Sequence, residues 1–145
     1  MPSFTAIESL DAYPQVIIPT QHIPNGADVL KVKEPWCSMI LSGRKSKEIR
    51  GSVTKKRGWI YISPSGFPNI VGQAWLENCT RITNESEWLS QTPEHCVSGK
   101  ALPYKKTFAW HLKHAARFEV PVHHKAARGC VVWSHFESKE AKKNI

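Results

Sequence analysis

The sequence has 145 residues, 41% of them hydrophobic and 22% charged, which is the size and composition of one globular domain and excludes a disordered chain. Its apolar runs fall short of the ~18–20 residues of a membrane-spanning helix, its start lacks the features of a signal peptide, and its four cysteines are too widely spaced for a disulfide-stapled secreted domain. With a net charge of +8, we expect a soluble intracellular protein, cytoplasmic or, in a eukaryote, nuclear, whose partners are anionic.

The first elements expected along the chain are an extended arm, a strand and a short helix. Four prolines in residues 1–28 indicate an N-terminal arm with at most a short strand at 15–18. A strand is expected at 29–32. A helix follows it, because Pro35 suits a first helical turn and Gly43 suits a left-handed C-terminal cap. The buried stripe of this helix consists of Trp36, Met39 and Ile40.

The rest of the chain is predicted to consist mainly of short strands. Apolar or alternating segments indicate strands at 45–50, 59–63, 70–79, 108–112, 118–122 and 129–136. Pro121 confines its strand to a sheet edge or a bulge, because proline cannot donate a ladder hydrogen bond. Asn84 and Glu87 have the spacing of a capping box and predict a second short helix. Residues 91–104 are expected to be irregular.

Together these elements predict an α+β fold. Their order favours a small mixed β-barrel, closed or nearly closed, with two or three short helices. We expect the arm to occupy residues 1–28, the domain residues 29–136 and a charged tail residues 137–145. The sequence does not fix the oligomeric state, and a monomer is favoured.

Basic residues gather in two segments of the chain. Residues 31–57 hold nine basic and two acidic side chains, for +7, and residues 100–145 hold ten basic and three acidic ones, again for +7. Residues 1–30 and 58–99 carry −3 each. If the two basic segments meet in the fold, they form a positive face that attracts phosphate backbones. The alternative is a basic charge that serves solubility alone.

Several motifs stand in a defined order along the sequence. Pro35-Trp36 precedes the first helix, Gly43, Lys45, Glu48 and Arg50 follow it, and Arg57-Gly58 leads a hydrophobic strand. Later pieces are Val71 to Ala74, Phe108 to Trp110, and Pro121-Val122 followed by Gly129. In order and spacing they resemble the ASCH domain family of the PUA-like superfamily, over about residues 29–136. The resemblance implies a ligand cleft between the first helix and the barrel, with RNA or a nucleotide as the partner; DNA stays open as an alternative.

The chemistry of the motif fits such a ligand. Strand alternation places Glu48 and Arg50 on one face, and the long stem of Lys45 can reach either side. Arg50 can hold a phosphate through two parallel hydrogen bonds, Glu48 can accept from an exocyclic amine, and an aromatic ring can stack on a base. The residues expected to bind nucleic acid or nucleotide are Trp36, Lys45, Glu48, Arg50, Lys55, Lys56, Arg57, Tyr61 and Trp110.

Each of these residues also has a purely structural interpretation. Glu48 and Arg50 can form a surface ion pair worth less than about 1 kcal/mol. Trp36 can belong to the core, and the basic residues 55–57 can form a solvated turn. Three further tryptophans are assigned to core or barrel packing: Trp59, Trp75 and Trp133.

The histidines and cysteines do not indicate a metal site. Only His111 and His114 approach the spacing of paired ligands in structural zinc sites, and they are one residue too close. Cys96 and Cys130 have no partner at ligand spacing. The run from His123 to Lys125 is expected to form a basic loop beside the cleft. We therefore expect no metal and no cofactor.

Catalysis is an open alternative to binding. One ASCH-like branch hydrolyses acetylated cytidine, and the resemblance places its lysine at Lys45 but its threonine nucleophile at Glu48, where no hydroxyl is present. Cleavage of RNA would need a base and a cation near the phosphate. The alternative function is therefore a hydrolase of RNA or of a modified nucleoside with Lys45 and Glu48 as catalytic residues. A protein-interaction domain with a vestigial cleft is the third interpretation.

Overall fold

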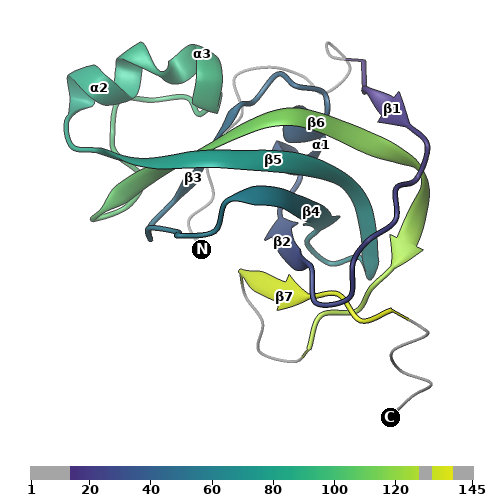
Figure 1. The fold of residues 1–145 in the computed structure, drawn as a ribbon. Helices are drawn as coiled ribbons and strands as arrows, with labels where there is room; N and C mark the ends of the chain where they lie inside the picture. Colours follow the sequence, from purple (N-terminus) through teal and green to yellow (C-terminus); the bar gives the residue numbers. More distant parts are fainter. Residues whose placement is uncertain (1–13, 128–131, 139–145) are drawn as a thin grey trace.

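A computed structural model describes residues 14–127 and 132–138, which fold into one curved sheet with three helices (Figure 1). The strands are β1 (Ile17–Ile18), β2 (Asp28–Val32), β3 (Lys47–Arg50), β4 (Gly58–Pro64), β5 (Asn69–Ile82), β6 (Thr107–His123) and β7 (Trp133–His135). The helices are α1 (Trp36–Leu41), α2 (Glu85–Ser90) and α3 (Thr92–His95). No helix in the described ranges is long and apolar enough to cross a membrane.

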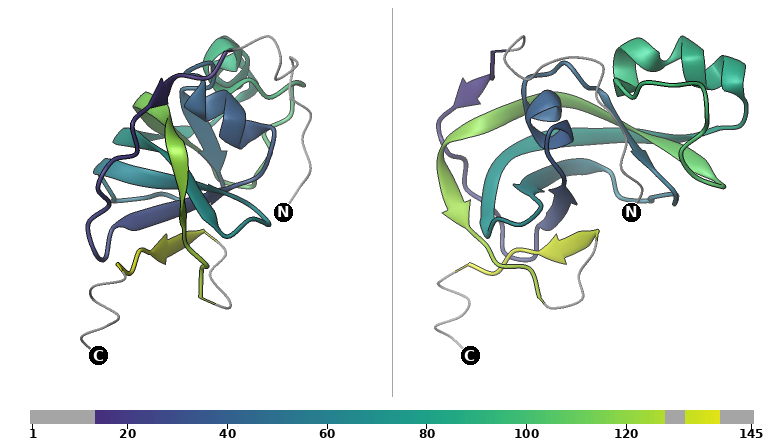
Figure 2. Two further views of the ribbon diagram at one scale, coloured as in Figure 1. Left: turned by 90° about the vertical axis from the view of Figure 1, so that its right-hand side faces the viewer. Right: turned by 180° about the vertical axis from the view of Figure 1, so that it is seen from behind.

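The sheet is built around the long antiparallel pair β5 and β6, both of which curve strongly (Figure 2). The strand order is β1-β6-β5-β4-β2-β7, and β3 pairs with the first part of β6. The two ends of this path, β1 and β7, have two and three residues and do not pair with each other in the described part of the chain. The α+β class and the short helices are as predicted, but the sheet is open, so the predicted barrel is not confirmed.

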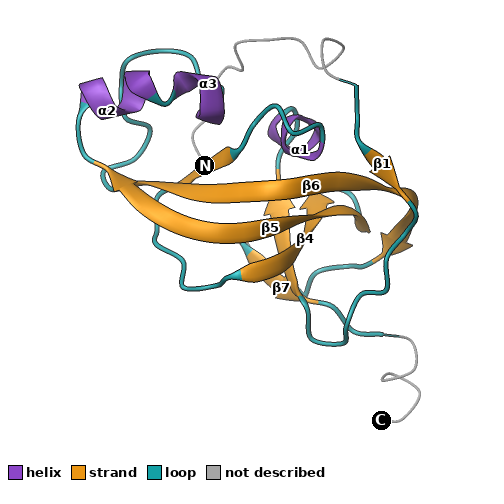
Figure 3. Cartoon of the chain, turned by 45° about the horizontal axis from the view of Figure 1, so that its top comes forward, coloured by secondary structure: helices purple, strands orange, loops and turns teal. Residues whose placement is uncertain are grey.

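Helix α1 packs against β4, β5 and β6 (Figure 3). Five of its six residues are buried, because the curved sheet surrounds it, and it contributes to the main core. The largest buried strand residues of that core include Leu30, Ile60, Ile62, Leu76 and Trp110. Pro35, which was expected in the first turn, immediately precedes the helix as its N-cap, and Gly43 has the expected left-handed φ, at 82°. The regular helix ends at Leu41, two residues before Gly43, and Ser42 is its C-cap.

Helices α2 and α3 cover a second layer of apolar side chains next to β3. These buried residues are Ile49, Ile82, Trp88, Val97 and Ala109. The Asn84 side chain accepts a hydrogen bond from the Glu87 N–H, but the Glu87 carboxylate accepts from the Thr83 N–H, so half of the predicted capping box forms. Helix α3 lies in the stretch that was expected to be irregular. It is a single turn of four residues with no periodic apolar stripe, which is why the sequence pattern gives no sign of it.

The two strands predicted at 108–112 and 118–122 are one continuous strand, β6. The register between β5 and β6 shifts within it, since Gly72 pairs with Arg117 and Ile70 with Val122. Pro121 lies in this bulge, where its missing N–H is tolerated, as predicted. The predicted last strand is observed as β7 alone. Residues 1–13 of the arm, residue 128, residues 129–131 of that strand and residues 139–145 of the tail lie outside the described residues.

The described part of the arm runs along the outside of the sheet. Strand β1 pairs in parallel with β6, through Ile17 with Arg117 and Ile18 with Phe118, which confirms a short strand inside the predicted range 15–18. A further buried cluster joins the arm to the sheet through Ile23, Val29, Tyr61, Ile70 and Phe118. The arm therefore contributes its own apolar contacts to the fold.

Two tryptophans assigned to core or barrel packing, Trp59 and Trp75, lie on the outer face of the sheet. Trp59 is 45% exposed, and its ring meets that of the half-buried Trp75 edge to face at 5.2 Å. Its neighbour Ile60 faces the main core, so strand alternation turns Trp59 to the outer face. The core assignment of Trp59 is wrong for this reason, whereas Trp133 packs against the main core as expected.

Candidate nucleic-acid interface

Three ionisable side chains of the predicted motif meet inside the fold. Lys45 is 2% exposed, Glu48 4% and Arg50 7%. Arg50 donates two hydrogen bonds to Oε2 of Glu48, from Nε at 2.9 Å and from Nη2 at 2.7 Å, and Oε1 of Glu48 lies 3.8 Å from Nζ of Lys45. We call Lys45, Glu48 and Arg50 the buried ion cluster. It is not the surface ion pair of the structural interpretation.

The backbone explains why these side chains meet. Strand β3 points Glu48 and Arg50 toward Trp110 of the main core, while Ile49 points to the opposite face beneath the helices, as strand alternation predicts. Lys45 comes from the turn after α1, and its N–H donates to the Met39 carbonyl at 3.0 Å. The end of α1 and the start of β3 therefore converge on one buried point.

Tryptophan rings contact the cations of the buried ion cluster, and a further cation, Lys56, contacts the outermost of these rings. The Lys45 amine lies 4.9 Å from the centre of the Trp36 ring, and the Arg50 guanidinium lies 5.7 Å from that of Trp110. Trp110 stacks on Trp133 with ring centres 5.7 Å apart and an interplanar angle of 8°, and Lys56 covers Trp133 at 5.0 Å. These contacts extend from the buried ion cluster to the surface, because Trp36 and Trp133 are only partly buried.

The electrostatics of the cluster are unbalanced. Two cationic side chains face one carboxylate, so the group has an excess of one positive charge. Burial lowers the pKa of Lys45 from 10.5 to about 8; Glu48 opposes this change and Arg50 adds to it. The Lys45 ammonium is therefore far easier to deprotonate than that of a solvated lysine.

Lys45 also connects the buried ion cluster to the layer formed by α2 and α3. Its amine donates to the His95 carbonyl at 2.5 Å. His95 is fully buried, stacks on Trp88 with ring centres 3.8 Å apart, and accepts at Nδ1 from the Val97 N–H. Because Nδ1 accepts, Nε2 carries the proton and donates to the Trp88 carbonyl at 2.9 Å. Burial lowers the pKa of His95 to about 4, so this ring is neutral at physiological pH.

The predicted basic turn lies at the rim of this region. Lys56 forms an ion pair with Asp28 at 2.7 Å while it covers the Trp133 ring. Lys55 and Arg57 are exposed, and Arg57 donates to the carbonyls of Thr54 and Lys56. We call Lys55, Lys56 and Arg57 the rim cations. Lys56 is the one whose contacts connect it to the buried ion cluster, through the two stacked tryptophans.

Tyr61 is not brought to this region. It is buried with Phe118 in the cluster beneath the arm, with ring centres 6.4 Å apart. Its neighbours Ile60 and Ile62 belong to the main core, so Tyr61 faces the other side of the sheet. Burial alone raises its pKa, which fits a packing role.

Two participants in the site were missed or misjudged from the sequence. The sequence pattern assigns Trp133 to packing alone, and it gives no sign that the Ser52 carbonyl accepts a hydrogen bond from Nε1 of Trp110 at 3.0 Å. Nothing in the spacing of the sequence links residue 133 to residue 110. Only the pairing of β7 with β2 brings that tryptophan to the site.

The basic run His123 to Lys125 lies at the far end of β6 from the buried ion cluster. Strand β3 pairs with residues 108–111 at one end of β6, whereas His123 is its last residue. In residues 14–127 and 132–138, no group of three histidine, cysteine, aspartate or glutamate side chains is placed to hold a metal ion. Cys130 lies outside these ranges.

Known families and structures show what the chain is similar to. The family model described as the ASCH domain matches residues 30–122. The crystal structure of ASCH from Zymomonas mobilis superposes with a TM-score of 0.63 at 16% identity, over 81% of this chain and 92% of that one. A serine-to-alanine variant of the same protein gives 0.63 at 17%, over 84% and 96%.

A more distant similarity is to the YTH domain of a Zygosaccharomyces rouxii protein in complex with N6-methyladenosine RNA. Its TM-score is 0.41 at 12% identity, over 90% of this chain and 92% of that one. No curated protein is similar enough in sequence to match the chain. At these identities the structural similarities concern the fold and not the ligand.

Proposed function

Because the chain belongs to the ASCH domain family, with its PUA-like fold, we propose that it binds RNA or a nucleotide at the surface formed by the rim cations and the partly exposed rings of Trp36 and Trp133. The observation that carries the proposal is the buried ion cluster directly behind this surface. It holds more positive than negative charge and has aromatic rings on its borders.

Such a cluster is a costly way to build a core. Removing ions from water costs several kcal/mol each, and apolar residues of similar volume often give equal or greater stability. Burial also lowers the pKa of Lys45, and residues with such shifted pKa values are enriched at functional sites. Lys45, Glu48 and Arg50 therefore support a role beyond packing.

The surface in front of the cluster has the chemistry of a nucleic-acid site. The rim cations can neutralise backbone phosphates without reading sequence. A base can stack on Trp133 when Lys56 leaves its ring, and the same ammonium is then available to a phosphate. In this arrangement Arg50 and Glu48 hold the tryptophan stack in place from behind and do not touch the ligand, because both are buried.

Binding of a fluorescein-labelled single-stranded RNA, followed by anisotropy, tests the proposal. The variants Lys55→Gln, Lys56→Gln and Arg57→Gln each remove one rim cation. Each should weaken binding several-fold, because each removes one positive charge that can neutralise a backbone phosphate.

Lys113→Gln is the matched control. Lys113 is an exposed lysine paired with Glu77 at 2.7 Å, and it lies across the sheet from Trp75, on the outer face. It should bind RNA as the wild type does. Wild-type protein that shows no binding to RNA, DNA or nucleotides at low salt, or rim variants that match the control, would overturn the proposal.

A second candidate function, hydrolysis of RNA or of an acylated nucleoside, is favoured by one observation. The pKa of Lys45 is lowered to about 8, which brings its amine into the range of a general base. If Lys45 is the base, turnover of labelled RNA or acetylated cytidine should rise with pH up to about 8 and disappear in Lys45→Met. Absence of turnover in the wild type, or wild-type turnover in a folded Lys45→Met, excludes hydrolysis and leaves the binding proposal untouched.

A further inference from the structure

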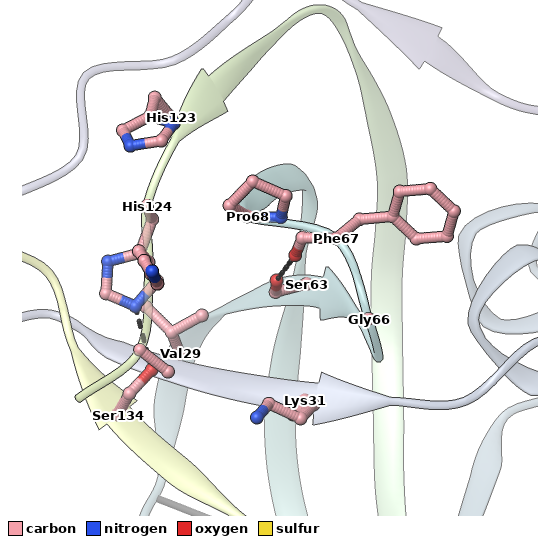
Figure 4. A pocket seen from close by; sticks show the side chains of 11 residues that line it. Val29, Lys31, Ser63, Gly66, Phe67, Pro68, His123, His124 and Ser134 are labelled. Carbon is pink, nitrogen blue, oxygen red and sulfur yellow. Dashed lines mark hydrogen bonds between the residues drawn. The ribbon is translucent and has the colours of Figure 1, made fainter. Parts of the chain in front are cut away.

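A pocket of about 510 Å³ lies at the end of β6 remote from the buried ion cluster (Figure 4). It is lined by the β4–β5 turn on one side and by residues 123–126 on the other, above one face of strands β2, β4 and β7. Its volume lies in the range of ~300–1,000 Å³ that is usual for small-molecule sites. None of the described residues that line it belongs to the surface proposed above.

The register of the strands explains the floor of the pocket. Lys31 stands opposite Ser63, and Val29 stands opposite Ser134, so these four side chains share one face of the sheet. Both serines are small and more than nine-tenths buried. Larger residues at positions 63 and 134 would fill the space, so the choice of serine leaves both a hollow and two hydroxyl groups at its base.

The walls are held by hydrogen bonds between distant parts of the chain. The His124 N–H donates to the Pro68 carbonyl at 2.9 Å, which joins the end of β6 to the β4–β5 turn. The His124 ring is within 2.8 Å of the Ser134 hydroxyl, so it faces the floor, as Figure 4 shows. The turn reverses at Gly66, whose φ of 87° is left-handed. The pocket is therefore a built feature and not a gap between loosely packed loops.

The charge of the lining has one sign. Lys31 and Lys125 are cationic, and His123 and His124 can donate or accept hydrogen bonds. No aspartate or glutamate is among the described residues that line the pocket. An adjoining hollow of about 380 Å³ shares His123, His124, Lys125 and Ser134 with it and adds one carboxylate, that of Glu137. The larger pocket thus combines ammonium, imidazole and hydroxyl groups with an apolar side made of Val29, Phe67, Pro68 and Ala126.

We propose that this pocket binds a phosphate monoester, with the phosphate between Lys31, Lys125 and the histidine–serine wall and the esterified group against the apolar side. Ammonium groups are suited to a phosphate as point charges, and hydroxyl and imidazole groups complete its hydrogen bonds. No carboxylate is among the described residues that line the pocket, so the nearest acidic group of the two hollows is Glu137 in the adjoining one. A mononucleotide and the 5′ end of a phosphorylated RNA both present this group. The inference does not depend on RNA binding at the rim cations.

Isothermal titration with adenosine 5′-monophosphate, inorganic phosphate and adenosine tests the assignment. The monophosphate should bind with one site per chain, inorganic phosphate more weakly, and adenosine without measurable heat. Lys31→Gln and Lys125→Gln should each lower the affinity for the monophosphate about tenfold, as expected for the loss of one charge-assisted hydrogen bond. Lys113→Gln, which removes an exposed charge elsewhere on the sheet, should have no effect.

The source of the phosphate is resolved by a competition experiment. If the natural group is an RNA end, 5′-phosphorylated RNA displaces the monophosphate and 5′-hydroxyl RNA does not; if it is a free nucleotide, neither does. Equal affinity for adenosine and its monophosphate, no saturable binding of the monophosphate, or wild-type affinity in both Lys31→Gln and Lys125→Gln would overturn the proposal. Because Lys125 is exposed, its variant remains a fair test even if Lys31→Gln disturbs β2.

Discussion

Glu48 is the residue on which the centre of the molecule depends. Its carboxylate accepts two hydrogen bonds from Arg50 and is the counter-charge of Lys45, and all three side chains are buried. Removing the charge of one partner in such a group leaves the others buried without compensation. The whole arrangement is therefore more sensitive to Glu48 than to any single rim cation.

Glu48→Gln should lower the free energy of unfolding by about 3–5 kcal/mol, because Lys45 and Arg50 then face each other without a carboxylate. Replacing the pair together, with Glu48→Leu and Arg50→Met, should cost less than the sum of the single changes. Chemical denaturation measures both. Glu77→Gln, at an exposed carboxylate that pairs with Lys113, should leave stability nearly unchanged. If Glu48→Gln is as mild as this control, the cluster is not coupled as we describe.

His95 makes stability depend on pH in the acid range. Its pKa is about 4 in the folded protein and near 6.5 in the unfolded chain, so between these values the unfolded state binds more protons. Stability should therefore fall as the pH decreases from 6.5 to 4, with a contribution of about 3 kcal/mol from this residue.

The matching measurement is urea denaturation at several pH values. His95→Gln should be less stable at pH 7, because Trp88 loses its stacked ring, but its stability should depend less on pH between 6.5 and 4. His22→Gln, at an exposed histidine, should keep the wild-type profile. A profile for His95→Gln parallel to that of the wild type would contradict the neutral buried ring.

At the scale of elements, close contact between α1 and the sheet depends on Gly72. A Cβ at this position would overlap the Ala116 carbonyl oxygen and would lie 2.7 Å from Cδ2 of Leu41 in α1. Gly72→Ala should therefore destabilise the fold by about 3 kcal/mol or more, since the backbone must move.

Gly99→Ala is the control that distinguishes the effect of the steric clash at Gly72 from the effect of backbone strain alone. Gly99 has a φ of 96° but open space around its Cα, so alanine there meets only the conformational penalty of about 1 kcal/mol. Thermal unfolding of the two variants should rank Gly72→Ala well below Gly99→Ala. Equal melting temperatures would show that β5 and β6 can separate locally at small cost.

Elements with strong local signals could be predicted from the sequence, and those defined by distant contacts could not. The proline and glycine around α1 fixed its position, and Pro121 indicated its bulge, because these residues restrict the backbone directly. Helix α3 has four residues and no apolar period, so only its packing reveals it. Barrel closure was inferred from the order of strands, but strand order does not determine whether short edge strands such as β1 and β7 meet.

The same distinction applies to the candidate site. The alternation of β3 predicted correctly that Glu48 and Arg50 share a face. It could not predict their burial, because this depends on the residues that α1 and β6 bring over them. Tyr61 lies between Ile60 and Ile62 in β4, so strand alternation turns it to the opposite face, but only the contacts of the arm show that this face has a buried cluster of its own.

For the whole molecule, the pairing of β3 with β6 brings the two basic segments of the sequence together. Lys47 pairs with His111, and Arg50 pairs with Phe108, which follows the exposed Lys105 and Lys106 by two to three positions. The acidic first segment is not remote from this face, because Asp28 pairs with Lys56 at its rim. Charge is thus arranged so that a polyanion meets Lys56 only by competing with Asp28.

The salt dependence of RNA binding tests the central claim most directly. For single-stranded RNA the logarithm of the affinity should fall linearly with the logarithm of the salt concentration, with a slope of about −0.7 for each phosphate neutralised. Three rim cations therefore predict a slope of about −2 or steeper, and Lys56→Gln should reduce it by about 0.7 while Lys113→Gln does not change it. Affinity that does not vary with salt, or a slope that Lys56→Gln leaves as it was, would contradict binding at this surface.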